Sequence, residues 1–98
     1  MDKRKEKRHK TRQIVKVCGK LGVVKDVSAE GLQVSVALSP KKRNVDISLE
    51  INGKSIALMG IIQWIKQRQK MQQPNELGII LKNTPPEYLA FVEQFNSR

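Results

Sequence analysis

The clearest pattern in the chain is the alternation of apolar and polar side chains over short stretches. Residues 45–51 alternate strictly, and residues 31–36 alternate in the same way. A period of two is typical of strands that bury one face. Four further stretches are rich in aliphatic residues and predict strands over 13–18, 23–27, 55–65 and 77–81. The pattern therefore predicts six short strands.

Turn-forming residues separate the predicted strands. Glycines at 19 and 22 predict a turn over 19–22 between the first two strands. Asn52-Gly53 predicts a two-residue hairpin turn, because both residues tolerate the positive φ of a type I′ turn. The charged stretch 39–44 contains a proline, and the stretch 66–76 is rich in glutamine, so we expect loops at both places.

The end of the chain carries the signature of a helix over residues 85–96. The Thr84 side chain can accept from the third amide of the helix, while Glu87 can reach back to the Thr84 amide. Pro85 suits the first helical position. One apolar face follows at helical spacing and can pack on a sheet: Tyr88, Phe91, Val92 and Phe95. The fold class expected is mainly β, a six-stranded antiparallel barrel with a C-terminal helix.

Composition divides the chain into a leader and one domain. The 98 residues carry 19 Lys and Arg against 9 Asp and Glu, a net charge of +10 that indicates an anionic partner. Residues 1–12 alone hold seven basic and two acidic side chains and no apolar face. We therefore expect a basic leader over 1–12, mobile without a ligand, and a single barrel domain over 13–98.

Several classes of function are disfavoured by what the chain contains. Cys18 is the single cysteine, which excludes an internal disulfide and a multi-cysteine zinc site. Neither His9 nor Cys18 has the companions that metal binding or nucleophilic catalysis needs, so we expect no enzyme, metal or cofactor. The N-terminus is charged and lacks an apolar signal segment, and the longest apolar stretch is too short to span a bilayer. We expect a soluble cytoplasmic protein without membrane insertion.

Two short motifs lie at the start of the barrel. Arg8 and Arg12 stand four residues apart before the first strand, and residues 26–31 read Asp-Val-Ser-Ala-Glu-Gly between the second and third strands. Together they resemble the signature of the PilZ domain family, Arg-x-x-x-Arg followed by Asp/Asn-x-Ser-x-x-Gly. Residues 60–64 and 77–81 are similar to two later strands of that family. The resemblance covers nearly the whole chain and implies a split-barrel fold that binds cyclic di-GMP, a bacterial second messenger.

The chemistry of the motif residues suits such a ligand. Arg8 and Arg12 offer planar charged forks for phosphate oxygens or for guanine O6 and N7. Asp26 can accept from the guanine N1–H and N2–H₂ donors, and Ser28 adds a hydroxyl. Gly31 permits a close backbone approach or a positive φ. We expect the two arginines to clamp the ligand against the other three residues while the leader wraps over it.

Three further residues are candidates for the same site. Arg4 forms a second Arg-x-x-x-Arg copy with Arg8, His9 lies inside the motif, and Trp64 could stack on a base. For Trp64 we favour packing in the core or at a partly exposed position over a stacking role. Two features depart from the family pattern: only thirteen residues separate Arg12 from Asp26, and Glu30 places a carboxylate beside a site for an anion.

Other interpretations remain for the same residues. A basic run is usually a solvated tail, and Asp-x-Ser-x-x-Gly can be a plain turn. The leading hypothesis is a receptor or adaptor that binds cyclic di-GMP and changes a surface read by an unidentified downstream protein. A nucleic-acid-binding barrel is one alternative, disfavoured because the charge concentrates in the leader and only Trp64 is an aromatic residue on a strand. A PilZ-like protein-docking adaptor without ligand is the other.

Overall fold

A computed structural model describes residues 9–37, 40–67 and 74–96. All strand pairings in this part of the chain are antiparallel. In chain order the elements are β1 (His9–Lys10), β2 (Ile14–Val17), β3 (Lys20–Ser28), β4 (Gly31–Val36), β5 (Asn44–Ile51), β6 (Lys54–Lys66), β7 (Asn75–Lys82) and α1 (Pro86–Asn96).

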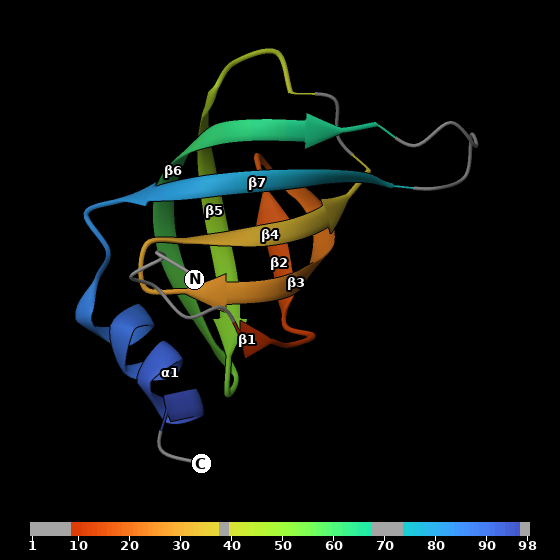
Figure 1. Cartoon of the computed structure of the whole chain (residues 1–98). Coiled ribbons are helices and arrows are strands. Elements are labelled where there is room, and N and C mark those ends of the chain that lie inside the picture. Colours follow the sequence, from red (N-terminus) through yellow and green to blue (C-terminus); the bar gives the residue numbers. More distant parts are fainter. Residues whose placement is uncertain (1–8, 38–39, 68–73, 97–98) are drawn as a thin grey trace, which may run out of the picture.

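Strands β2 to β7 close into a six-stranded antiparallel barrel (Figure 1). The ring runs β3, β2, β5, β6, β7, β4 and closes because β4 also pairs with β3. The mainly β barrel expected from the alternating pattern is therefore confirmed. Each strand turns alternate aliphatic side chains into the barrel, and Val15, Val24, Leu32 and Leu49 are among those with no exposed surface.

Two tight turns shape the hairpins. Asn52 and Gly53 have φ values of 51° and 81°, which confirms the predicted Asn-Gly turn between β5 and β6. The first turn differs from the prediction. Cys18 and Gly19 supply the two positive φ values, 51° and 85°, so β3 already begins at Lys20 and Gly22 lies inside the strand.

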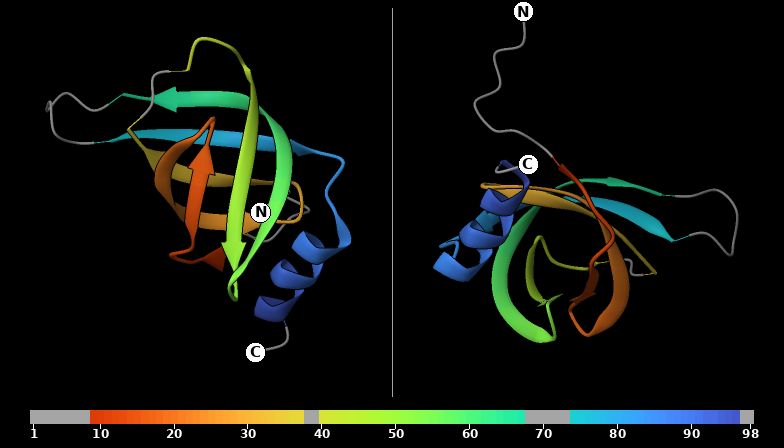
Figure 2. Two further views of the ribbon diagram at one scale, coloured as in Figure 1. Left: turned by 180° about the vertical axis from the view of Figure 1, so that it is seen from behind. Right: turned by 90° about the horizontal axis from the view of Figure 1, so that it is seen from below.

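Helix α1 lies outside the barrel wall, near the turn between β3 and β4 (Figures 1 and 2). Its predicted apolar face is confirmed for Tyr88, Phe91 and Val92, which are all buried in the core cluster. The helix begins at Pro86, one residue later than predicted. The Pro85 carbonyl accepts from the amides of Tyr88 and Leu89, at 3.0 and 3.2 Å, so Pro86 takes the first helical position.

The leader and the loops differ from the prediction in extent. His9 and Lys10 form β1 rather than part of an unpaired leader, because β2 pairs with β3 only up to Val23 and leaves the end of β3 open. Residues 1–8 lie outside the described part of the chain. Of the predicted loop over 66–76, Lys66 ends β6 and Asn75 begins β7. No helix in the described segments is long and apolar enough to cross a membrane.

Candidate ligand site

Backbone pairing fastens the end of the basic leader to the strand that carries Asp26. His9 lies opposite Val27, and Lys10 lies opposite Asp26. The Thr11 amide then donates to the Lys25 carbonyl at 3.1 Å. The end of the first motif therefore runs alongside β3, the strand that carries Asp26, although thirteen residues separate Arg12 from Asp26 in the chain.

Arg12 lines an open hollow beside this pairing. The hollow has a cavity volume of about 530 Å³. The Arg12 side chain is exposed, so its charge is available to a ligand. Residues from the leader, β3 and β4 form the walls: Thr11, Arg12, Val23, Val24, Lys25 and Ser35. The hollow is large enough for a nucleotide-sized group and presents two cations to it.

A β-bulge positions the second cation, Lys25. The register between β3 and β4 shifts between Val24 and Asp26, which leaves Lys25 as the extra residue. Its ammonium forms a 2.9 Å ion pair with Glu76 on β7, the strand on the far side of β4. The Lys25 side chain is 50% exposed and the Glu76 side chain 14%. The ion pair therefore links the bulge on β3 to β7.

Asp26 belongs to a row of residues across the outer face of the barrel. It pairs with Gln33 on β4, Gln33 pairs with Gly78 on β7, and Gly78 pairs with Trp64 on β6. Neighbouring strands lie about 4.8 Å apart, so Asp26 and Gly78 are separated by about 10 Å. Asp26 is partly exposed. Asp26, the candidate carboxylate, and Trp64, the single tryptophan, therefore lie at the two ends of one row across the strands.

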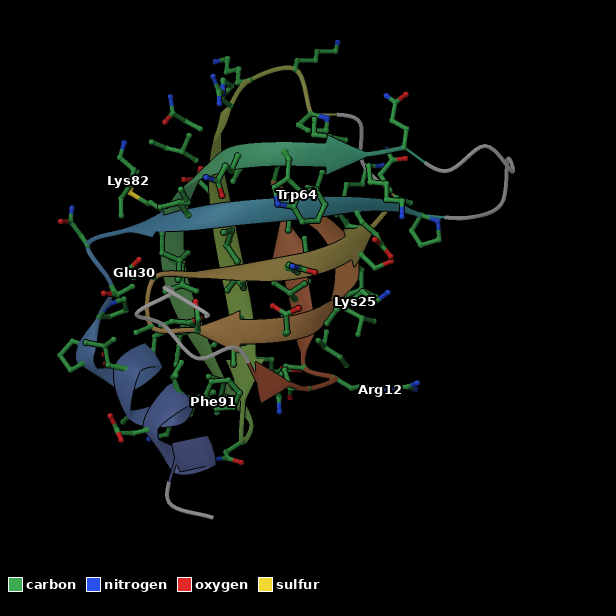
Figure 3. All side chains as sticks on the ribbon, in the orientation of Figure 1. Arg12, Lys25, Glu30, Trp64, Lys82 and Phe91 are labelled. Carbon is green, nitrogen blue, oxygen red and sulfur yellow. The ribbon has the colours of Figure 1, made fainter. Side chains whose placement is uncertain are left out.

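Trp64 covers Gly78 on this outer face (Figure 3). A Cβ atom at position 78 would collide with the indole, so the glycine provides the space in which the ring packs. Trp64 remains 39% exposed. The partial exposure expected from the sequence is confirmed, and the exposed part of the ring lies on the same face as Asp26.

Ser28 and Gly31 hold the turn between β3 and β4. The Ser28 side chain is fully buried, and its hydroxyl donates to the Gly31 carbonyl at 3.3 Å. The Tyr88 hydroxyl donates to the same region, 2.7 Å from the Ser28 carbonyl and 3.0 Å from the Gly31 carbonyl. Direct contact between Ser28 and a ligand would require this turn to open.

Position 31 requires glycine because the backbone of β7 approaches closely, and not because of a positive φ. Its φ is not in the left-handed region, whereas a Cβ atom there would collide with the Ile79 carbonyl of β7. Glu30 is exposed in the same turn, and its own carbonyl accepts from the Leu81 amide at 2.8 Å. Figure 3 places Glu30 at the opposite end of the β3–β4 hairpin from Lys25 and Arg12.

The remaining predicted residues are placed only in part. Arg4 and Arg8 lie outside the described residues, and of His9 only the backbone, in β1, is described. The structure adds residues that the sequence pattern did not assign to the site: Lys25, Gln33, Glu76, Gly78 and Tyr88. Within the described part of the chain no three histidine, cysteine, aspartate or glutamate residues lie close enough together to hold a metal ion.

Comparison with known proteins bears on the fold. No family model matches the sequence, and no curated protein matches it. A solved structure of the Bacillus subtilis inhibitor of motility, MotI/DgrA, superposes with a TM-score of 0.72 at 14% sequence identity. The match covers 100% of this chain and 54% of the MotI/DgrA chain, so this chain spans about half the length of that protein. The barrel has a PilZ-like fold.

Proposed function

We propose that this chain is a cyclic di-GMP receptor that acts as an adaptor. Arg8 and Arg12 clamp the ligand's phosphates or guanines against Asp26, and the bound form is read by a downstream protein. The pairing of β1 with β3 carries the proposal, because it brings Arg12 beside the strand of Asp26. The similarity in fold to a protein described as an inhibitor of motility supports a regulatory role rather than a catalytic one.

The outer face of the barrel suits the two halves of this ligand. Charge-assisted hydrogen bonds from Arg12 would fix the anionic part in the hollow. Asp26 can accept from a guanine edge, and the exposed part of the Trp64 ring can stack on a base at the other end of the row. Ser28 and Gly31 contribute by holding the turn that follows Asp26, since the Ser28 hydroxyl donates to the Gly31 carbonyl, which also accepts from the Tyr88 hydroxyl.

Calorimetric titration with cyclic di-GMP tests the proposal. A hydrogen bond to a charged group contributes about 1.5–3 kcal/mol, so Arg12→Ala and Asp26→Ala should each weaken binding by about tenfold or more. Lys54→Ala is the matched control, because Lys54 is an exposed cation in the β5–β6 hairpin and should not change the affinity. Unchanged binding by Arg12→Ala, or no saturable binding by the unaltered chain, would refute the proposed function.

A further inference from the structure

The end of β6 has a strand on one side only. Strand β5 pairs with β6 as far as Ile61. Strand β6 continues to Lys66, and over this last part the register pairs it with β7 alone among the described strands. Figure 1 shows β7 along one side of this segment, while the chain leading into β5 arches past the other side. We call this side of Gln63 to Lys66 the free edge of β6.

Arg43 fixes the point at which the free edge begins. The Ile62 amide donates to the Arg43 carbonyl at 2.7 Å. In return the Arg43 guanidinium donates to the Ile62 carbonyl, through Nε at 3.4 Å and Nη2 at 3.3 Å. The register with β7 then shifts between Ile62 and Trp64, which leaves Gln63 as the extra residue of a β-bulge. The guanidinium has further N–H donors, which suit a carboxylate placed along the edge.

A small open hollow follows the free edge. Its cavity volume is about 290 Å³. Residues of the loop before β5 and of β6 form its walls: Pro40, Lys41, Lys42, Arg43, Ile62, Gln63, Trp64 and Ile65. None of these lines the hollow beside Arg12. Trp64 also belongs to the row that runs to Asp26, so neither the argument nor the test below depends on its ring.

The charge of this hollow has one sign. Three of its lining residues, Lys41, Lys42 and Arg43, are exposed cations, and no lining residue is acidic. The carboxylate of Glu76 belongs to β7, on the opposite side of β6 from the free edge, and it is paired with Lys25. The free edge is therefore flanked by positive charge alone among its lining residues.

An uncovered strand edge offers a row of backbone N–H and C=O groups, and an extended peptide can pair with them as an added strand. Lysines and bulges on such an edge oppose pairing with a second copy of the same chain. Here a second copy would bring two sets of three cations together. The same cations attract an acidic segment, so they select the partner by charge.

The free edge suits a peptide better than a nucleic acid. Single-stranded nucleic acids stack successive bases on several aromatic rings. Among the residues that line this hollow, Trp64 is the single aromatic one. Pairing along a strand edge requires only main-chain groups and an extended partner, and both the edge and its charge meet that requirement.

We propose that the free edge of β6 binds an extended, acidic segment of a partner protein as an added β-strand. The main chain of that segment pairs along Gln63 to Lys66, and its carboxylates meet Lys41, Lys42 and Arg43. An apolar side chain of the segment covers Ile65, which is 43% exposed. At about 3.3 Å per residue, a segment of about four to six residues spans the edge. This binding goes beyond cyclic di-GMP binding and does not depend on it.

Fluorescence anisotropy with three defined peptides tests the added strand. The first is a fluorescein-labelled peptide that alternates valine and glutamate. The second carries lysine in place of glutamate. The third has the side chains of the first but N-methylated amides, which cannot donate. At about 150 mM salt, where distant charges are screened, the unaltered chain should bind the first peptide saturably. It should bind each of the other two at least about tenfold more weakly.

Reversing charge at the hollow tests where the peptide binds. Lys41→Glu/Lys42→Glu should lower the affinity for the acidic peptide by about tenfold or more. Lys20→Glu/Lys54→Glu is the matched control, because it changes the net charge equally at exposed lysines that line neither hollow. The control should stay within about threefold of the unaltered chain, since only screened, long-range attraction is lost.

Four results would overturn the added strand. They are no binding of the acidic peptide, equal binding of the basic peptide, equal binding of the N-methylated peptide, and equal losses in the two double variants. If the acidic peptide does not bind, two further measurements show what uses the edge instead. A dimer in sedimentation velocity would assign it to a second copy. Oligonucleotide binding that Lys41→Glu/Lys42→Glu removes would assign it to a nucleic acid.

Calorimetry with cyclic di-GMP separates this proposal from the proposed function. Lys41→Glu/Lys42→Glu should bind cyclic di-GMP as the charge-matched Lys20→Glu/Lys54→Glu variant does. If the unaltered chain binds the acidic peptide but not cyclic di-GMP, the proposed function fails and the added strand stands. If it binds cyclic di-GMP but not the peptide, the reverse holds.

Discussion

Ser28 and Gly31 have structural roles that their place in the motif conceals. Their backbone carbonyls both lie within hydrogen-bonding distance of the Tyr88 hydroxyl, which comes from the C-terminal helix. A sequence pattern cannot reveal this, because the partner is 57 or more residues away along the chain. Arg12 and Asp26 differ, since both keep exposed surface. At the scale of residues, the motif thus divides into a pair that can meet a ligand and a pair that holds a turn.

Tyr88→Phe should separate these roles. The change removes a buried hydroxyl donor from two carbonyls, and we expect the free energy of unfolding to fall by about 1–3 kcal/mol. Chemical denaturation measures this fall. Gln94→Ala, at an exposed position on the same helix, is the control and should stay within about 0.5 kcal/mol of the unaltered chain. A Tyr88→Phe variant as stable as the Gln94→Ala variant would contradict the role assigned to the hydroxyl.

Gly78→Val tests the packing of Trp64. A side chain at position 78 collides with the indole, so the ring must leave its place over β7. Because Trp64 is the single tryptophan, its fluorescence reports this directly. We expect the emission maximum to move to longer wavelength as the ring becomes more exposed to water. Ile80→Val, at a partly exposed outer position on the same strand, should leave the emission unchanged. An unshifted spectrum in Gly78→Val would show that the ring does not depend on this space.

Strands and turns differ in how well the sequence predicts them. The six barrel strands and the Asn52-Gly53 turn follow from alternation and from a dipeptide with known turn chemistry. Strand β1 does not, because it has only two residues, both polar, and so carries no alternating pattern. The first turn was misplaced for a related reason: Cys18 adopts a positive φ that its residue type does not favour.

Thr11→Pro tests β1 as the element that delivers Arg12. Proline removes the amide that donates to the Lys25 carbonyl, so the leader should detach from β3. We expect cyclic di-GMP binding to weaken by tenfold or more in calorimetry, while the free energy of unfolding falls by only about 1 kcal/mol. Thr11→Ala retains the amide and should bind normally. Equal affinities of the proline and alanine variants for cyclic di-GMP would show that β1 does not position Arg12 for binding.

The net charge of +10 belongs to the whole molecule and can attract two kinds of anionic partner. A small ligand with two phosphates and a nucleic acid strand differ in how strongly salt weakens their binding. A protein that contacts six to ten phosphates loses about 10³–10⁵ in affinity between 50 and 200 mM salt. Salt dependence therefore discriminates between the receptor and the nucleic-acid-binding alternative.

We expect cyclic di-GMP affinity to fall by at most about tenfold over that range, since two phosphates are neutralised. A single-stranded DNA oligonucleotide should bind only near 50 mM salt, because the account expects it to contact the basic surface non-specifically. Calorimetry for the ligand and anisotropy for a labelled oligonucleotide measure the two dependences. Tight oligonucleotide binding that persists at 200 mM salt would favour the nucleic-acid-binding barrel.

The most direct test of the central claim is where cyclic di-GMP binds, and amide chemical shifts of the isotope-labelled chain answer it. We predict that titration moves the resonances of residues 11–12 and 25–26, together with Gln33 and the single Trp64 indole N–H. The resonances of amides around the Asn52-Gly53 turn, whose residues do not line the hollow, should stay in place. Shifts confined to the β5–β6 hairpin, or no shifts at saturating ligand, would contradict the account.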